Sequence, residues 1–301
     1  MNLSERASDA GYAAGWRLVR SLPEGVARRL FDRGADFASS RNGGPDQLRR
    51  NLARVLGTTA EQVPDDLIRE SVRSYARYWR EAFRLPSMDL AAQAAVIDRC
   101  VYGKEHLEAA LGAGKGVVLA LPHSGNWDMA GMWLVRTHGG LSTVAERLKP
   151  ESLYQRFVAY RESLGFEIFP LSGGEQPPLL ALSDRLRQNK VVCLLGERDL
   201  AKHGVPVTFF GEPTRMPAGA AKLAIDTGAT LLPVHGYFDG DGWGFDISPA
   251  VDVSQGVAAA TQTVADHFAA GIRAHPADWH MLQPLWMSDW SAERRARIEG
   301  T

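Results

Sequence analysis

Short apolar segments alternate with longer amphipathic ones from about residue 100 onward, and this alternation restricts the fold more than any other feature. The apolar segments are rich in β-branched residues and bounded by turn residues, as buried strands are. They occupy residues 116–122, 190–197 and 229–238, with a further candidate at 244–253. Helical periodicity marks residues 126–137, 150–164, 177–189, 217–227 and 256–274. Strands that alternate with helices predict an α/β fold, with a largely parallel central sheet flanked by helices.

The first hundred residues have a different pattern, which predicts a helical N-terminal lobe. Helical spacing begins near Trp16 and is interrupted near Pro23. A later segment, DQLRRNLARVLG, stops at a glycine as helices commonly do. We expect a single domain over residues 1–301, in which 1–100 form the helical lobe and 101–301 form the α/β core.

The most regular helical segment, DDLIRESVRSYARYWREAFRLP, is amphipathic and basic. Such a helix can lie on an anionic membrane surface. It can also pack its apolar side against the core and leave its arginines in solvent. In the membrane interpretation, the side chains that insert are Trp16, Phe31 and Trp79. Those that meet anionic headgroups are Arg17, Arg20, Arg73, Arg77 and Arg80.

Bulk composition excludes several classes of protein. The 301 residues carry a formal net charge of −1, which argues against a nucleic-acid-binding protein. The two cysteines, Cys100 and Cys193, are too far apart to indicate a zinc knuckle or a disulfide framework, and a reducing compartment fits them best. The N-terminus lacks the apolar core of a signal peptide, and no apolar stretch is long enough to span a bilayer. We expect a protein that stays in solution or at a membrane surface.

Common catalytic motifs are absent. GAGKG at 112–116 lacks the spacing of a phosphate-binding loop and the Ser or Thr that follows it, so a turn is expected there. The chain contains no G-x-S-x-G nucleophile elbow and no H-E-x-x-H motif. Neither a serine nucleophile nor a catalytic metal is expected.

The stretch LPHSGNWDMAG places a histidine where a strand is expected to give way to a helix. A strand that ends at Pro122 puts His123 at the carboxyl edge of the sheet, where α/β proteins bind ligands. Five residues later, Asp128 can meet His123 only if the histidine lies in the turn before the helix. In that geometry the histidine is a candidate general base for an alcohol. Alternatively, His123 and Asp128 are structural residues at a helix start.

Four sequence blocks, in the same order, resemble those of known acyltransferases. H-x-x-x-x-D between a strand and a helix resembles the first motif of the glycerolipid and lysophospholipid acyltransferases. The blocks LLGERDL and FFGEPTRMPAGAAKLAIDTGATLLPV resemble later motifs of that superfamily. The block HPADWHMLQPLW is similar to the C-terminal block of its bacterial lipid A late acyltransferase branch. Within this branch, GYAAGWRLVRSLPE, HSGNWD and GERDL most resemble the mycobacterial phosphatidylinositol mannoside acyltransferases.

This resemblance implies an α/β sheet with a surface groove for the active site and a buried tunnel for an acyl chain. It implies transfer of a fatty acyl group, typically palmitoyl, from acyl-CoA to a mannose hydroxyl of the glycolipid. It also implies a peripheral location on the cytoplasmic face of the cell membrane. His123 matches the histidine of the family motif. A thiolate leaves readily, so we expect neither a metal nor a redox cofactor.

The acidic partner of His123 has two candidates. Asp128 matches the family motif, and Glu197 can reach the same imidazole from the neighbouring strand. We predict that Glu197 is the relay carboxylate and that Asp128 helps to hold the loop.

Further residues are candidates for substrate binding. Arg161 is expected to face the thioester or the CoA phosphates, or else solvent. Lys202 and His203 follow GERDL and are candidates for phosphate contacts. A proline-flanked loop before a helix makes Arg215 the better phosphate candidate. The remaining candidates are Arg198 and Asp199 at a strand end, Glu146 on the acceptor side, and Asp226 in the last turn of a helix.

An acyltransferase for a lipid A-type or another glycerolipid acceptor is a close variant of this function, and two alternatives to an acyltransferase also remain. A thioesterase would use the same histidine with water as the acceptor. A non-catalytic lipid-binding protein would use HSGNWD only to hold its structure. Acceptor-dependent release of CoA separates an acyltransferase from a thioesterase, and any histidine-dependent turnover excludes the non-catalytic alternative.

Overall fold

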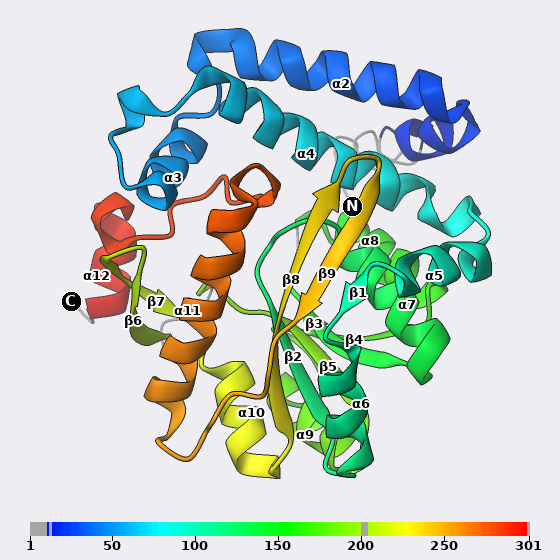
Figure 1. The fold of residues 1–301 in the computed structure, drawn as a ribbon, viewed down its shortest axis with the longest axis vertical. Coiled ribbons are helices and arrows are strands. Elements are labelled where there is room, and N and C mark those ends of the chain that lie inside the picture. Colours follow the sequence, from blue (N-terminus) through cyan, green and yellow to red (C-terminus); the bar gives the residue numbers. More distant parts are fainter. Residues whose placement is uncertain (1–10, 12–13, 148, 200–203, 300–301) are drawn as a thin grey trace.

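A mostly parallel sheet of seven strands forms the centre of the computed structural model, which describes residues 11, 14–147, 149–199 and 204–299 (Figure 1). The strand order is β1-β9-β8-β2-β5-β3-β4, and only β8 and β9 pair in antiparallel fashion. The strands are β1 (Val101–Tyr102), β2 (Val117–Leu121), β3 (Leu141–Ala145), β4 (Phe166–Pro170), β5 (Val191–Leu195), β8 (Thr230–Asp239) and β9 (Gly242–Ile247).

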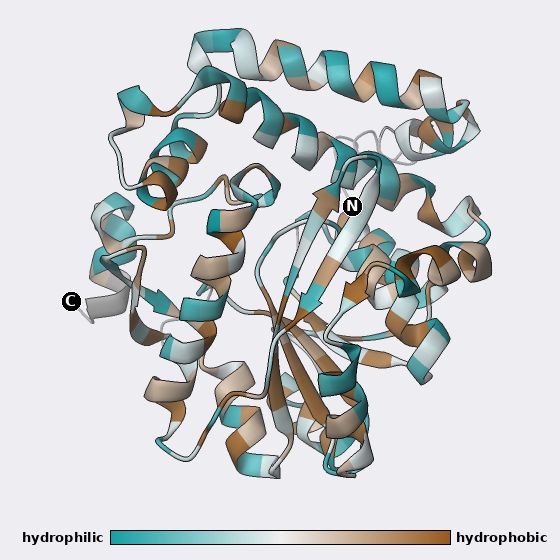
Figure 2. Cartoon of the chain, in the orientation of Figure 1, coloured by the Kyte–Doolittle hydropathy of each residue, from teal (hydrophilic) through white to brown (hydrophobic). Residues whose placement is uncertain are grey.

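Helices cover both faces of the sheet and bury a core on each. One core lies between the sheet and α9 (Pro178–Arg187), α10 (Gly219–Thr227) and α11 (Val257–Ala274). The second hydrophobic core lies on the other face of the sheet, which packs against four helices that come earlier in the chain: α5 (Leu90–Asp98), α6 (Lys104–Gly112), α7 (Trp127–His138) and α8 (Glu151–Ser163). The central strands are hydrophobic along their length because both faces are buried (Figure 2). The predicted α/β fold class is confirmed.

The N-terminal lobe consists of helices, and its two longest lie across the top of the sheet in Figure 1. The helices are α2 (Glu24–Ser40), α3 (Asp46–Leu56) and α4 (Asp65–Arg84). The predicted interruption near Pro23 is confirmed, since α2 begins at Glu24. Among the described residues, no helix is both long and apolar enough to cross a membrane.

The arginines of α4 form the suggested solvated face only in part, because Arg69 and Arg73 are exposed whereas Arg77 and Arg80 are not. Arg77 binds Glu81 at 2.7 Å and donates to backbone carbonyls of the β8–β9 turn. Arg80 is buried and contacts Glu24 of α2 at 3.3 Å. Arg73 pairs with Asp36 of α2 at 2.6 Å. These contacts hold α4 to its neighbours and occupy Arg77 and Arg80 of the predicted membrane-binding set, whereas the Arg73 side chain stays 45% exposed.

Two segments differ from the sequence prediction. The expected strand 244–253 is β9 and ends at Ile247, although Val251 beyond it still donates its N–H to the carbonyl of Leu231 in β8 at 2.9 Å. Residues expected to form a proline-flanked loop instead form a β-hairpin, β6 (Val205–Phe209) and β7 (Glu212–Met216). Trp286 closes this hairpin with an indole N–H that donates to the carbonyl of Phe209 at 3.0 Å. A distant partner therefore stabilises strands that local sequence did not indicate.

Candidate active site

His123 and Glu197 meet at the carboxyl edge of the sheet because β2 and β5 are parallel neighbours in register. Leu121 pairs with Leu195, and each catalytic candidate follows its strand by two residues. Glu197 Oε1 accepts the backbone N–H of His123 at 2.5 Å and lies 2.8 Å from its Nδ1. The carboxylate therefore fixes both the backbone and the ring of His123.

This contact decides which nitrogen of His123 is free. An ionised Glu197 can only accept, so Nδ1 carries the proton and Nε2 keeps its lone pair. Burial alone raises the pKa of Glu197, but the nearby His123 and the hydrogen bonds from it outweigh burial and leave the pKa below its ordinary value. Glu197 is wholly buried, whereas the His123 side chain is 27% exposed. A neutral imidazole with its Nε2 available is the state that a general base requires.

The loop between β2 and α7 holds His123 in place through its small and polar residues. The Ser124 hydroxyl donates to the carbonyl of Gly236 at 2.7 Å. Gly125 has a φ of 59°, and a Cβ there would lie 2.6 Å from the backbone of Gly236. Asn126 caps α7 by accepting the N–H of Met129 at 3.1 Å. This close approach to β8 explains why the sequence H-S-G-N occurs here.

Asp128 does not contact His123 in this geometry. Its carboxylate is buried and lies 2.9 Å from Arg161 Nε, and its Oδ2 accepts the Tyr78 hydroxyl at 3.0 Å. Burial alone lowers the pKa of Arg161, but Asp128 outweighs burial and raises it, so the guanidinium stays charged. Asp128 therefore holds Arg161 and α8 against the first turn of α7.

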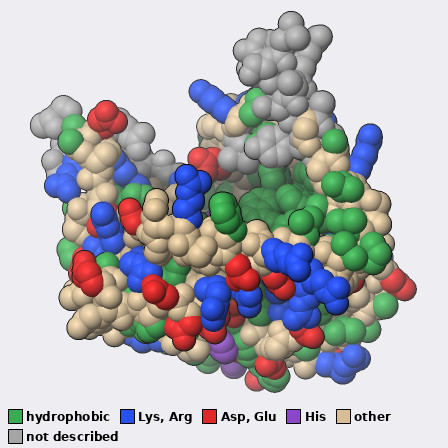
Figure 3. All heavy atoms as spheres, turned by 90° about the horizontal axis from the view of Figure 1, so that it is seen from above, with side chains coloured by type: hydrophobic (Ala, Val, Ile, Leu, Met, Phe, Trp, Pro, Cys, Tyr) green, Lys and Arg blue, Asp and Glu red, His purple; other side chains and the backbone are tan. Residues whose placement is uncertain are grey.

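A groove opens beside His123 on the face shown in Figure 3, where hydrophobic side chains line a hollow. Aromatic residues from α4 and α8 form much of its wall: Tyr75, Tyr78, Trp79, Tyr154 and Phe157. The partly exposed aromatic residues of α4 thus face the groove, which is why the predicted apolar stripe of that helix is not fully buried.

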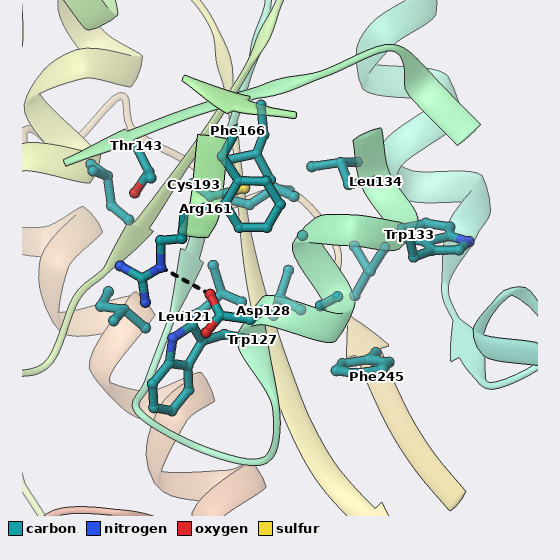
Figure 4. Close-up of a pocket in the computed structure, with 18 of the residues that line it drawn as sticks. Leu121, Trp127, Asp128, Trp133, Leu134, Thr143, Arg161, Phe166, Cys193 and Phe245 are labelled. Atoms are coloured by element: carbon teal, nitrogen blue, oxygen red, sulfur yellow. Dashed lines mark hydrogen bonds and ion pairs between the residues drawn. The ribbon is translucent and has the colours of Figure 1, made fainter. Parts of the chain in front are cut away.

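A second, apolar cavity continues from this groove beneath α7 (Figure 4). Four residues line both spaces: Trp127, Val144, Arg161 and Leu195. The cavity runs between α7 and the sheet, across the strands from β3 to β9 and β1. At its far end its walls include Val101, Phe245 and Ile247. The protein therefore has a solvent-exposed groove that contains the histidine and an apolar cavity that suits a hydrocarbon chain.

Cys193 lines the cavity but is not chemically activated. Burial raises the pKa of its thiol to about 12, so it stays protonated at neutral pH. Within the described part of the chain, no group of three or more His, Cys, Asp or Glu residues is arranged to hold a metal ion.

Three of the predicted substrate-binding residues line the groove: Glu146, Arg161 and Arg198. Glu146 follows β3 and Arg198 follows β5, and their side chains lie 3.7 Å apart. Asp199 is buried instead and accepts the backbone N–H of Gly204 at 3.1 Å. Arg161 lies at the junction of groove and cavity, held by Asp128 rather than directed into solvent.

The other predicted residues are placed differently or lie outside the described residues. Arg215 is on strand β7 rather than in a loop before a helix, and it is not among the residues that line the groove. Asp226 pairs with Lys222 at 2.8 Å on α10, so its partner is a local lysine. Lys202 and His203 lie outside the described residues.

The groove also contains a buried histidine that sequence reasoning did not single out. His280 Nε2 lies 2.9 Å from the Ser74 hydroxyl, which donates to Asp278 at 2.6 Å. Burial lowers the pKa of His280 to about 3, so its ring is neutral. The block D-W-H-M, quoted above as part of the resemblance, was the available signal. Only the packing of this block against α4 shows that the histidine faces the groove.

Sequence comparisons identify the family. The sequence profile of the bacterial lipid A biosynthesis acyltransferases matches residues 4–288. A Mycobacterium tuberculosis protein named phosphatidylinositol mannoside acyltransferase is 62% identical over 298 residues, which cover 99% of this chain and 94% of that protein. A protein of the same name from Mycolicibacterium smegmatis is 63% identical over 300 residues, which cover 98% of this chain and 97% of its own length. The chain is therefore an acyltransferase that belongs to the bacterial lipid A biosynthesis acyltransferase family.

Proposed function

We propose that this enzyme transfers a fatty acyl group from acyl-CoA to a mannose hydroxyl of a phosphatidylinositol mannoside, with His123 as the general base. The observation that carries the proposal is the position of the His123–Glu197 pair in a groove that continues into an apolar cavity. The names of the two relatives support the acceptor, since both are phosphatidylinositol mannoside acyltransferases that align with nearly the whole chain.

The mechanism needs one proton transfer in each direction. His123 Nε2 takes the proton of the mannose hydroxyl as its oxygen bonds to the thioester carbonyl carbon, and an electron pair moves onto the carbonyl oxygen. When the tetrahedral intermediate collapses, the C=O bond re-forms, the C–S bond breaks, and the leaving thiolate takes the proton from the imidazolium. The carboxylate of Glu197 stabilises that imidazolium from the Nδ1 side. Acyl transfer is direct, without an acyl–enzyme intermediate.

The number of strands along the cavity wall supports a donor close to palmitoyl-CoA. The cavity wall includes residues of β3, β5, β2, β8 and β9, which are consecutive strands of the sheet. Four spacings of about 4.8 Å between neighbouring strands amount to about 19 Å. An extended palmitoyl chain has a similar length, because each single bond between its carbons adds about 1.25 Å. We propose that the acyl chain lies across the strands and ends against Phe245 and Ile247.

The acceptor is a lipid, so we propose that the enzyme acts as a peripheral protein at the cytoplasmic face of the cell membrane. The exposed face of α2 supplies an alternative to the arginines of α4. Val26, Leu30 and Phe37 are exposed at helical spacing, and Phe37 is 68% exposed. Arg29 and Arg33 are exposed on the same helix. Apolar side chains flanked by arginines suit an anionic lipid surface.

Vesicle co-sedimentation tests this attachment. Leu30→Ser and Phe37→Ser together should weaken binding to vesicles rich in phosphatidylinositol, and high salt should release the wild-type protein. A matched control is Leu180→Ser, since Leu180 on α9 is as exposed as Leu30, at 57% against 55%, and α9 lies at the opposite end of the molecule from α2 (Figure 1). Equal effects of the α2 and α9 changes would refute this orientation.

The catalytic proposal is tested with purified protein, palmitoyl-CoA and phosphatidylinositol mannosides, with products identified by mass spectrometry. His123→Ala should lower turnover by roughly two to four orders of magnitude while acyl-CoA binding is largely kept. Release of CoA should depend on the acceptor. Release at the same rate without any glycolipid would favour a thioesterase instead.

A further inference from the structure

The junction between groove and cavity is where a bound thioester must place its carbonyl group. The acyl chain lies in the apolar cavity and the base lies in the groove, so the reacting carbon sits between them. Of the four residues that line both spaces, only Trp127 and Arg161 carry polar side-chain atoms. Figure 4 shows these two residues at one end of the cavity and Trp133 at the other. Hydrogen-bond donors for the thioester oxygen therefore come from few side chains.

Trp127 brings an unused donor to this junction. Its indole Nε1 is buried and has no hydrogen-bond partner among the described residues. Buried donors are nearly always paired, so an unpaired one needs an explanation. Trp133 lines the same cavity and provides the contrast, since its Nε1–H donates to Asp98 at 3.0 Å. Arg161 uses its Nε–H on Asp128 at 2.9 Å, and the four N–H groups on its two Nη atoms are further donors at the junction.

The Trp127 ring is held beside the proposed base. Its centroid lies 4.0 Å from that of Tyr78 and 5.6 Å from that of His123, against which it packs edge-on. The residue is the first of α7, after the Asn126 cap, so its backbone is also fixed. A donor that is already oriented costs little reorganisation when charge develops on a substrate oxygen.

We propose that the indole N–H of Trp127 donates a hydrogen bond to the carbonyl oxygen of the acyl-CoA thioester and stabilises the oxyanion that forms there. This inference rests on the proposed acyl transfer. Trp127 then has a catalytic role that is separate from those of His123 and Glu197. The nearby charge of Arg161 adds to the same stabilisation without requiring its Nε–H.

The direct test is Trp127→Phe, which keeps an aromatic ring and removes the N–H group. We expect kcat to fall about 10²-fold, as for loss of one oxyanion donor, with KM for palmitoyl-CoA within about threefold of the wild-type value. The matched control is Trp290→Phe, because the Trp290 indole N–H donates to the carbonyl of Leu285 at 3.1 Å and the residue lines neither the groove nor the cavity, and its kcat should stay within a few-fold of wild type. Equal losses of kcat in the two variants would overturn the proposal.

A second test separates the hydrogen bond from packing and does not depend on turnover. Two non-reactive analogues of palmitoyl-CoA are compared, a thioether that lacks the carbonyl group and a ketone that keeps it. Trp127→Phe should weaken binding of the ketone about tenfold and leave binding of the thioether within about twofold. Equal weakening of both analogues would mean that Trp127 only packs against the chain.

Two controls test whether Trp127→Phe lowers kcat by disturbing the fold. One is thermal melting of the variant, and the other is a closer isostere of tryptophan. Replacement of Trp127 with benzothienylalanine substitutes sulfur for the N–H group and keeps the fused ring, and it should reproduce the loss of kcat. Normal kcat in that protein would overturn the proposal. Absence of acyl transfer by the wild-type enzyme would instead refute the proposed function, and the ketone–thioether comparison would still decide the role of Trp127.

Discussion

Replacing Glu197 with glutamine changes a single atom of the carboxyl group that holds His123. In the structure Oε1 receives both hydrogen bonds from His123, while Oε2 is buried and has no hydrogen-bond partner among the described residues. A glutamine amide oxygen in place of Oε1 keeps both bonds and the tautomer of the ring. The variant therefore removes the negative charge and keeps the geometry.

The expected loss of activity follows from that charge. Nδ1 and Oε1 lie 2.8 Å apart. The charge centres of imidazolium and carboxylate are farther apart, at about 4 Å, where their attraction is about 4 kcal/mol for an effective dielectric constant near 20. Since the imidazolium forms only during the reaction, we expect kcat to fall about 10³-fold in Glu197→Gln. KM for palmitoyl-CoA should change little.

The assay follows CoA release with palmitoyl-CoA and a phosphatidylinositol mannoside. Glu167→Gln is the matched control, because Glu167 on β4 pairs with Arg185 at 2.5 Å and does not line the groove. Its kcat should stay close to that of the wild type. A Glu197→Gln enzyme that retained kcat within about tenfold would refute the relay role. The same conclusion would follow if Asp128→Asn, with its fold intact, lowered kcat more than Glu197→Gln did.

The remaining predictions concern stability and chain length. Asp128→Asn removes the buried carboxylate that pairs with the partly buried Arg161 guanidinium, so thermal melting should show a loss of about 3 kcal/mol. A Cβ at Gly131 would lie 2.4 Å from Phe166 Cζ, so Gly131→Ala should narrow the cavity and raise the preference for shorter acyl donors, measured as kcat/KM across acyl-CoA lengths. Because the folded pKa of Glu197 lies below its unfolded value of 4.5, its contacts stabilise the fold above that pH and are lost as pH falls through the folded pKa. Melting at stepped pH should then show a steeper acid loss in the wild type than in Glu197→Gln.

Local sequence was sufficient to predict the strands that are buried on both faces. Strands β2, β5 and β8 lie where the short apolar runs predicted them, because only a two-sided burial makes such runs stable. The position of His123 at the carboxyl edge followed from the same pattern. The β6–β7 hairpin was missed because its stability depends on Trp286, which is far away in the chain.

For the candidate active site too, local sequence predicted some features and tertiary structure decided others. The residue types of the site, a histidine after one strand and candidate carboxylate partners, could be predicted from the sequence. Which carboxylate meets His123 depends on strand order, because β5 lies beside β2 and brings Glu197 within 2.8 Å. The direction of Asp128 depends on α8, which supplies Arg161 as its partner.

The amino-acid sequence by itself determined the α/β alternation, the helical lobe and the family motifs, since these depend on periodicity and local residue types. Tertiary structure alone decided that the arginines of α4 turn toward α2 and the β8–β9 turn, and that aromatic residues of the same helix wall the groove. It also decided that the Trp127 N–H has no partner in the described chain. Periodicity shows that a helix has two faces, but the partner of each face is set by long-range packing, which local sequence does not encode.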